Sequence, residues 1–412
     1  MVDPESVGVS SQRLSRIHPV MEKHVADDKL SGAATLIYRA GQVVYRDAIG
    51  LMDRERQLSM RHDSIFRIYS MTKPITCVAL MMLYEQGCFR LADPVSKFIP
   101  AFADLKVHPP GDARSDKLEA LERDVTVHDL LCHTSGMTYH FSEYGPVEQL
   151  YRDAKVVSDQ SLGQFVADLA ELPLAFQPGT AWRYSLSQDV VAHLVEVLSD
   201  SPFDEFLATN IFGPLGMTDT GFYVPADKHD RFAAMYGARD VLEFDATGAA
   251  AKAAADQGVN ELIGDPLTCL ESQPHNVLRG GHGLVSTLDD YLLFCRMLLD
   301  DGALRGVRLL SRKTVELMRC NHLPDALFPI GFEDGPQLGI GYGLGFGTVM
   351  DVGQSQSVGS ADTYFWSGAA NTSFWIDPRE DLIGIQMAQF QPSGHHLIAE
   401  DFKVMAYQAI VD

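Results

Sequence analysis

The sequence predicts a two-lobed α/β protein, in which both ends of the chain build one antiparallel sheet and a helical lobe is inserted between them. Three observations support this fold class. A strand-turn-strand pattern lies near the start of the chain, further strand patterns lie near its end, and the long middle has the apolar spacing of helices. With 412 residues, of which 46% are hydrophobic, the chain is long enough to bury a large core.

The first part of the chain predicts a helix followed by a β-hairpin. Apolar residues recur at helical spacing over residues 11–24, with Pro19 near the middle of that segment. Residues 33–39 and 43–50 then have strand character, and the short connection 40–42, Ala-Gly-Gln, has the length and composition of a hairpin turn. We therefore expect the first helix to cover a sheet that begins with this hairpin.

The middle of the chain predicts a mainly helical lobe. Segments with helical periodicity alternate with connections that contain proline and glycine, which are typical of loops. The predicted helices cover residues 76–87, 161–172, 186–199 and 201–212.

The last part of the chain returns to strands and closes with a helix over residues 395–410. The predicted strands are residues 342–347, 362–368, 372–378 and 382–390. We assign residues 1–72 and 275–412 to a discontinuous α/β sheet domain and residues 73–274 to the helical lobe, with the active site between them. The two terminal helices are expected to flank the sheet.

The net charge of −22 excludes several classes of partner. Such a chain repels phosphate backbones and anionic membrane surfaces, and no cluster of Lys and Arg offsets this charge, so we expect no nucleic-acid binding. The N-terminal segment lacks the basic start and apolar run of a secretory signal, and no segment has 18 uninterrupted apolar residues. We therefore expect a cytoplasmic protein without membrane contact.

Neither a disulfide, a metal site nor a cofactor is expected from the sequence. No CxxC pair and no HExxH pattern occurs, and the alternating glycines from Gly339 to Gly347 follow a strand period instead of opening a helix as a dinucleotide-binding loop does. The cysteines are scattered through apolar stretches, as reduced core residues of a cytosolic protein are: Cys77, Cys88, Cys132, Cys269, Cys295 and Cys320.

Ser70 and Lys73 form a Ser-x-x-Lys step at the predicted start of a helix. Pro74 follows at once, and proline is tolerated in a first helical turn, where backbone N–H groups lack intrahelical acceptors. Residues three apart share a helix face, so the lysine amine can reach the serine hydroxyl and accept its proton if burial lowers the amine pKa. The alternative is a chance pair, because serine is common.

Two further stretches carry candidate site residues. Residues 176–190 form a turn-rich segment that delivers Tyr184 before a helix, and an ammonium ion near this phenol would lower its pKa and make it a candidate base. Residues 362–375 read as two strands around a corner of small residues, where a substrate can approach backbone N–H groups closely. The alternatives are a core tyrosine and a plain tight hairpin.

These pieces together resemble the serine β-lactamase and penicillin-binding-protein superfamily, most closely the class C β-lactamase-like family VIII carboxylesterases. The resemblance covers nearly the whole chain, and its motifs occur in the order of that family. They are PESVGVSSQRL with the first hairpin, SMTKP, LLCHTSGMTY (130–139), PGTAWRYSL, IFGPLGMTDTGF (211–222), RGGHGLVST (279–287), GYGLGFG (341–347) and WSG (366–368).

The resemblance implies roles for individual residues. Ser70 is implied to be the acylated nucleophile, Lys73 its neighbouring base or proton relay, and Tyr184 the tyrosine of the second motif. The backbone N–H groups of Ser70 and Ala369 are implied to form the oxyanion hole. Either Lys73 or Tyr184 can take the first proton. Substrate contacts are implied for Tyr139, Leu186, Trp366, Ser367 and Gly368.

The sequence departs from true class C β-lactamases at two motifs. Their Tyr-x-Asn and Lys-Thr-Gly read here as Tyr184-Ser185-Leu186 and Trp366-Ser367-Gly368, so a lysine that attracts a substrate carboxylate is replaced by tryptophan. We therefore expect a serine hydrolase that cleaves small, short-chain carboxylic esters through a Ser70 acyl-enzyme. The alternatives are a β-lactamase or D-aminopeptidase, an acyltransferase, and a non-catalytic ligand-binding relative.

Overall fold

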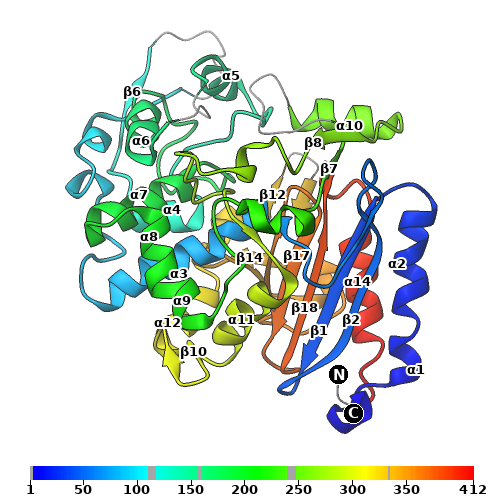
Figure 1. Ribbon diagram of the computed structural model, residues 1–412. Coiled ribbons are helices and arrows are strands. Elements are labelled where there is room, and N and C mark those ends of the chain that lie inside the picture. The colour runs from blue at the N-terminus through cyan, green and yellow to red at the C-terminus, as the bar shows by residue number, and fades with distance from the viewer. Residues whose placement is uncertain (1–2, 110–116, 156–159, 239–246, 333–334) are drawn as a thin grey trace.

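The computed structural model describes residues 3–109, 117–155, 160–238, 247–332 and 335–412. Its main sheet has eight strands in the order β14-β15-β16-β17-β18-β1-β2-β3, and neighbouring strands are antiparallel. The strands are β1 (Gly32–Arg39), β2 (Gln42–Asp53), β3 (Leu58–Ser59), β14 (Ile340–Tyr342), β15 (Gly347–Val349), β16 (Tyr364–Gly368), β17 (Thr372–Asp377) and β18 (Leu382–Ala388). The predicted sheet, built from both ends of the chain, is therefore confirmed (Figure 1).

The predicted β-hairpin lies near one edge of this sheet, where β2 pairs with the edge strand β3. β1 pairs with β2 on one side and with β18 on the other, from Ala33 opposite Ala388 to Arg39 opposite Leu382. Positive φ angles at Ala40 (47°) and Gly41 (85°) close the turn, as the right-handed twist of a two-residue hairpin requires. All residues of β1 are buried, because helices cover both faces of the sheet.

The terminal helices cover one face of the sheet. They are α1 (Ser11–Leu14), α2 (Ile17–Ala26) and α14 (Ile398–Tyr407), and α2 and α14 lie side by side against it in Figure 1. The predicted helix over residues 11–24 is divided in the structure, with α2 starting at Ile17. Pro19 consequently lies in the first turn of α2, where its missing N–H is not needed.

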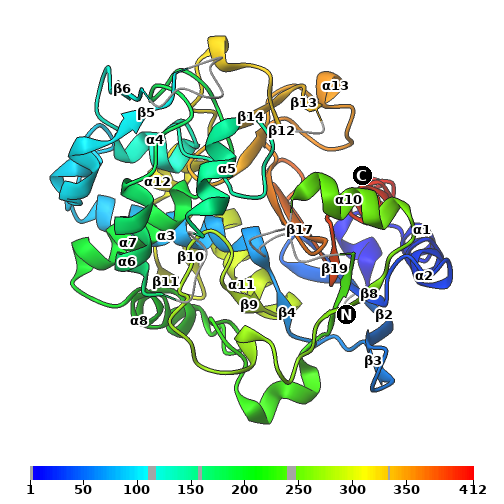
Figure 2. The ribbon, with the colours of Figure 1, turned by 90° about the horizontal axis from the view of Figure 1, so that it is seen from above.

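The helical lobe lies on the other side of the sheet, as the view from above shows (Figure 2). It includes α3 (Thr72–Glu85), α4 (Val127–Cys132), α5 (Pro146–Asp153), α6 (Leu162–Ala170), α7 (Ser187–Ser199), α8 (Phe203–Leu207) and α9 (Gly213–Leu215). α7 contacts α3, α4, α6 and α8 and is therefore the centre of the lobe. The helix predicted over residues 201–212 is α8, which continues as a π-helical turn over Ala208–Phe212.

The two largest apolar cores among the described residues result from these layers. The larger lies between the sheet and the lobe and includes α11 (Leu288–Leu299), and the smaller lies under the terminal helices.

A small second sheet joins β7 (Met235–Gly237) to β8 (Glu261–Gly264) and β19 (Phe390–Gln391). The other elements are β4 (Phe66–Arg67), β5 (Lys106–Val107), β6 (Glu119–Ala120), α10 (Gly248–Asp256), β9 (Val285–Ser286), β10 (Ala303–Leu304), β11 (Val307–Arg308), α12 (Arg312–Arg319), β12 (Ile330–Phe332), β13 (Gly335–Gln337) and α13 (Val352–Ser355).

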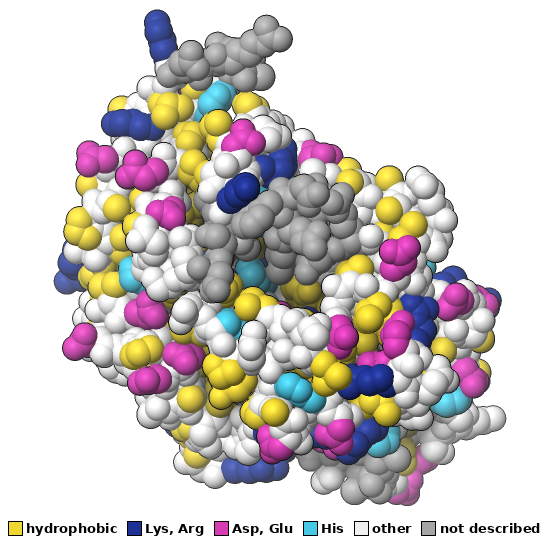
Figure 3. All heavy atoms as spheres, turned by 45° about the horizontal axis from the view of Figure 1, so that its top comes forward, with side chains coloured by type: hydrophobic (Ala, Val, Ile, Leu, Met, Phe, Trp, Pro, Cys, Tyr) yellow, Lys and Arg dark blue, Asp and Glu magenta, His cyan; other side chains and the backbone are white. Residues whose placement is uncertain are grey.

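On the face shown in Figure 3, acidic side chains are spread among isolated basic ones and hydrophobic side chains. Among the helices of the described ranges, none combines the length and the apolar character that crossing a membrane requires.

Candidate active site

Ser70 lies in a short 3₁₀ turn, Tyr69–Met71, which leads directly into α3. The preceding residue, Tyr69, has a φ of +42°, a left-handed conformation that costs a non-glycine residue about 1–3 kcal/mol. Packing of the buried Tyr69 ring against Met235 and Ala370 stabilises this turn. The turn places Ser70 at the first turn of a buried helix, where the helix dipole favours a developing negative charge.

Lys73 lies one turn further along and faces Ser70. Its Nζ is 3.0 Å from the Ser70 Oγ and donates a second hydrogen bond, of 2.6 Å, to the backbone carbonyl of Gly281. The side chain is fully buried, and this burial lowers the pKa of Lys73 from 10.5 to about 7, although the nearby carboxylate of Asp189 opposes the shift. A lysine whose pKa is lowered to near neutrality is partly neutral at pH 7 and can accept a proton.

Tyr184 lies on the loop before α7, with its ring beside Lys73. The Lys73 Nζ is 4.5 Å from the centre of this ring, and the Tyr184 hydroxyl accepts a 3.2 Å hydrogen bond from Trp366 Nε1. Burial raises the pKa of Tyr184 and outweighs its hydrogen bonds with Ser70 and Trp366. The predicted lowering of the Tyr184 pKa by the lysine is therefore wrong, because desolvation of the phenolate dominates.

The buried carboxylate of Asp189 acts on Lys73 through its charge and through a hydrogen bond to Gly281. Asp189, in the first turn of α7, accepts a 3.0 Å hydrogen bond from the Gly281 N–H, and its charge acts on both Lys73 and Arg279. A Cβ at Gly281 would lie 2.9 Å from Asp189 Oδ2 and 3.2 Å from the Tyr139 hydroxyl, so the close approach of this loop requires glycine. We assigned no role to Asp189 or Gly281 from the sequence, although Gly281 lies within the RGGHGLVST motif.

The end of β16 lies against the turn that carries Ser70. A Cβ at Gly368 would lie 2.4 Å from the carbonyl oxygen of Ile68, and the hydroxyl of Thr372 donates to that same oxygen at 3.3 Å. Ala369 follows in the turn to β17 and packs beside Tyr69. The predicted corner of small residues is thus a hairpin, and it also brings the Ala369 backbone close to the Ser70 turn.

The other candidate substrate contacts fall into two groups. Trp366 and Tyr139 are buried and touch the Tyr184 ring, with ring centres 5.4 and 5.3 Å away, and Ser367 is exposed beside them. Leu186, by contrast, is only 1% exposed and packs in the main core at the start of α7. The structure therefore brings Trp366 and Tyr139 to Tyr184, and it leaves Leu186 little surface for a substrate.

Aromatic side chains surround Tyr184 on several sides. Besides Trp366 and Tyr139, its ring meets the rings of His133, Trp182 and Phe332, with centres 4.8, 6.5 and 5.4 Å away. Burial holds the pKa of His133 well below its usual value, and its Nδ1 lies 3.1 Å from the Ser185 hydroxyl. His133 is therefore a neutral packing partner of Tyr184. It lies within the LLCHTSGMTY motif, which did not indicate this role, whereas Phe332 lies outside the quoted motifs.

Known proteins resemble this chain over most of its length. The profile of the Beta-lactamase family matches residues 17–406. Protein Rv1367c of Mycobacterium tuberculosis is 35% identical over 367 residues, which cover 88% of this chain and 86% of that protein. Esterase EstB of Burkholderia gladioli is 29% identical over 400 residues, covering 91% and 90%. The structure of EstCE1, a hydrolase with promiscuous acyltransferase activity, superposes with a TM-score of 0.77 at 27% identity and covers 96% of this chain and 99% of its own. The predicted β-lactamase-like fold is confirmed by these matches.

Proposed function

This chain belongs to the Beta-lactamase family, and from that premise we propose that it is a serine carboxylesterase that cleaves short-chain esters through an acyl-enzyme on Ser70. The observation that carries the proposal is the 3.0 Å contact between the Ser70 Oγ and a fully buried Lys73 amine. A serine hydroxyl is a weak nucleophile unless a neighbouring base accepts its proton, and a lysine with a pKa of about 7 can do so near neutral pH.

The pKa directions favour Lys73 as the first base and Tyr184 as a proton donor. Burial lowers the pKa of Lys73 towards neutrality and raises the pKa of Tyr184, so the amine is the better acceptor and the phenol stays protonated. Lys73 takes the proton of Ser70 as the Ser70 Oγ bonds to the ester carbonyl carbon. The Ser70 and Ala369 backbone N–H groups would then donate to the resulting oxyanion.

Collapse of the tetrahedral intermediate breaks the bond to the alcohol. The proton held by Lys73 passes to the departing alkoxide through the Tyr184 hydroxyl, and this transfer restores both groups. A water molecule then attacks the acyl-enzyme while Lys73 accepts its proton, and Ser70 recovers a proton as the carboxylic acid leaves. Asp189 and Gly281 act as positioning residues. The Gly281 carbonyl accepts a hydrogen bond from the Lys73 amine, and the Asp189 carboxylate accepts one from the Gly281 N–H, so the position of the amine is fixed.

Trp366 supports ester cleavage over lactam cleavage. In the sequence motif it takes the place of the lysine of β-lactamases, and its indole N–H already donates to the Tyr184 hydroxyl. Apart from Lys73, the described side chains named here around Tyr184 are aromatic, and an indole stands in place of the lysine of the motif, which favours neutral esters over substrates with a carboxylate. EstB is named an esterase and EstCE1 a hydrolase, which agrees with this choice.

The test compares one neutral ester with one lactam. We expect purified protein to hydrolyse p-nitrophenyl acetate with a kcat/KM at least about a hundredfold above that for nitrocefin, and Ser70→Ala to abolish both activities. The matched control is Ser59→Ala, an exposed serine on β3, at the edge of the sheet away from the site. Hydrolysis of nitrocefin in preference to the ester would refute the esterase proposal, and no turnover of either would favour a binding protein.

Acyl transfer is a second candidate because EstCE1 is described as having promiscuous acyltransferase activity. The same acyl-enzyme can react with an alcohol in place of water. Addition of a primary alcohol during ester turnover separates the two outcomes, since transfer yields a new ester and hydrolysis yields the carboxylic acid. A new ester as the main product at low alcohol concentration would identify this chain as an acyltransferase.

A further inference from the structure

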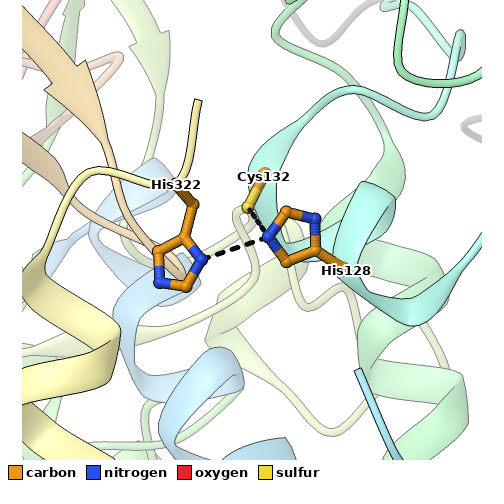
Figure 4. A group of neighbouring side chains, drawn as sticks. All are labelled: His128, Cys132 and His322. Carbon is orange, nitrogen blue, oxygen red and sulfur yellow. Dashed lines mark hydrogen bonds between the residues drawn. The ribbon is translucent and has the colours of Figure 1, made fainter. Parts of the chain in front are cut away.

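Three side chains with metal-binding chemistry converge outside the candidate active site. They are His128 and Cys132 on α4 and His322 after α12, and Figure 4 shows the two rings and the thiol turned toward a common point. One ligand atom from each residue lies within 4.8 Å of the other two. His128 and Cys132 are four residues apart and so share one face of α4, whereas His322 is 194 residues from His128 along the chain.

Two of the three spacings between these atoms match tetrahedral coordination. Nε2 of His128 lies 3.1 Å from Nδ1 of His322 and 3.5 Å from Sγ of Cys132. In a tetrahedral zinc site, usual bond lengths place two nitrogen ligands about 3.3 Å apart and a nitrogen and a sulfur about 3.6 Å apart. Two of the three separations therefore agree with zinc coordination. The third, between the ligand atoms of Cys132 and His322, lies within 4.8 Å and would shorten to about 3.6 Å on binding.

The hydrogen bonds of His322 direct its free lone pair toward the cluster. Its Nε2 lies 2.7 Å from the carbonyl oxygen of Leu317, and since a carbonyl only accepts, Nε2 carries the ring proton. Nδ1 is then unprotonated and faces Nε2 of His128, which in turn lies beside Sγ of Cys132. Metal-binding histidines commonly donate their other ring N–H to a carbonyl in this way, which fixes the ring in the binding orientation.

The elements that carry the three residues are held firmly. α4 starts with a capping box in which Thr126 and Asp129 bond each other, and the Asp129 carboxylate also pairs with Arg123. The His322 backbone N–H donates a 2.9 Å hydrogen bond to the carbonyl of Tyr342 on β14. The cluster is thus supported from the helical lobe and from the edge of the main sheet, as a preformed metal site requires.

We propose that His128, Cys132 and His322 bind one Zn²⁺ ion, with a water molecule in the fourth position. Zinc suits a set of two imidazoles and one thiolate, and binding replaces the thiol proton of Cys132, which is released to solvent. The role we assign to the ion is structural. It would join α4 to the segment before β14. His133 follows α4 and Tyr342 lies on β14, and the centres of their rings are 5.4 Å apart. His133 in turn contacts Tyr184, and Tyr342 contacts Trp366.

The alternative is a metal-free array in which His128 Nε2–H donates to His322 Nδ1. Titration of untagged, chelator-treated protein with Co²⁺ distinguishes the two. We expect one Co²⁺ per chain, a thiolate-to-cobalt charge-transfer band, displacement by Zn²⁺, and a rise in the melting temperature on adding Zn²⁺. Absence of the charge-transfer band in the wild type would overturn the proposal.

Variants assign the ligands. Cys132→Ser should abolish the charge-transfer band, and His322→Gln should weaken Zn²⁺ binding at least about a hundredfold, while Cys88→Ser and His193→Gln outside the cluster leave both unchanged. Loss of the band in Cys320→Ser but not in Cys132→Ser would contradict the proposal, since the exposed Cys320 thiol lies near the other nitrogen of His322.

The wild type alone gives a second test, in case a variant fails to fold. Its zinc X-ray absorption should show one sulfur at about 2.3 Å with nitrogen or oxygen ligands at about 2.0–2.1 Å. A shell of nitrogen and oxygen ligands without sulfur would also refute the site.

Discussion

Replacing Lys73 by methionine should make the folded protein more stable near neutral pH. Full burial lowers the pKa of Lys73 from 10.5, the ordinary value of a lysine in water, to about 7. Each pKa unit corresponds to about 1.4 kcal/mol, so holding this amine out of water costs the folded state up to about 5 kcal/mol at or below pH 7. Methionine fills similar space without that cost, although it leaves the Gly281 carbonyl without its Lys73 donor, a loss of about 1–3 kcal/mol.

The pH dependence of the free energy of unfolding tests this cost more specifically than stability at one pH does. Between pH 7 and pH 10.5 the unfolded chain binds more protons at Lys73 than the folded chain does, so wild-type stability rises with pH in that window. Relative to Lys73→Met, the wild type should therefore gain about 3 kcal/mol in its free energy of unfolding between about pH 7 and pH 9.5. The loss of the Gly281 hydrogen bond in the variant contributes little to this difference, because the peptide carbonyl does not titrate there.

Urea unfolding of both proteins at several pH values measures this difference directly. Lys252→Met, at an exposed position on α10, is the control for loss of a lysine as such. A difference between wild type and Lys73→Met that stays constant from about pH 7 to pH 9.5, or that moves in the opposite direction, would refute the inference that burial depresses the pKa of Lys73.

Three further predictions concern turnover of p-nitrophenyl acetate. If neutral Lys73 is the base, kcat/KM should rise about tenfold between about pH 6 and pH 8, and a flat profile over that range would contradict this role. Tyr184→Phe should lower kcat at least about a hundredfold by removing the proton donor, and a fall of less than about tenfold would limit Tyr184 to packing. Trp366→Lys should raise kcat/KM for nitrocefin relative to the ester, since a new cation attracts the lactam carboxylate, whereas Trp366→Met removes the indole without adding charge. An equal change in both Trp366 variants would show that the charge is not responsible.

Local features of the fold were accessible from the sequence. Alternation and turn composition predicted the β1–β2 hairpin, and Pro74 marked the start of α3, because such signals depend on neighbouring residues only. The division of the first helix was missed, since apolar spacing continues across the break between Leu14 and Ile17. Spacing alone does not record where a chain leaves helical geometry.

The candidate site was accessible only in part, because its pieces are distant in sequence. Ser70 and Lys73 are close by helix periodicity, but Asp189 meets Gly281 across 92 residues, a contact that only tertiary packing creates. The pKa of Tyr184 was predicted in the wrong direction for the same reason. Its burial among aromatic rings from several elements cannot be read from the residues around position 184.

The most direct test of the central claim is the rate at which Ser70 forms a covalent adduct. A fluorophosphonate probe should label the wild type at one site, which peptide mapping assigns to Ser70, and the labelling rate should increase with pH through about 7 as Lys73 loses its proton. Lys73→Met should label at least about a hundredfold more slowly while remaining folded. Labelling of any residue other than Ser70, or equal labelling rates in the wild type and Lys73→Met, would contradict a Ser70 nucleophile activated by Lys73.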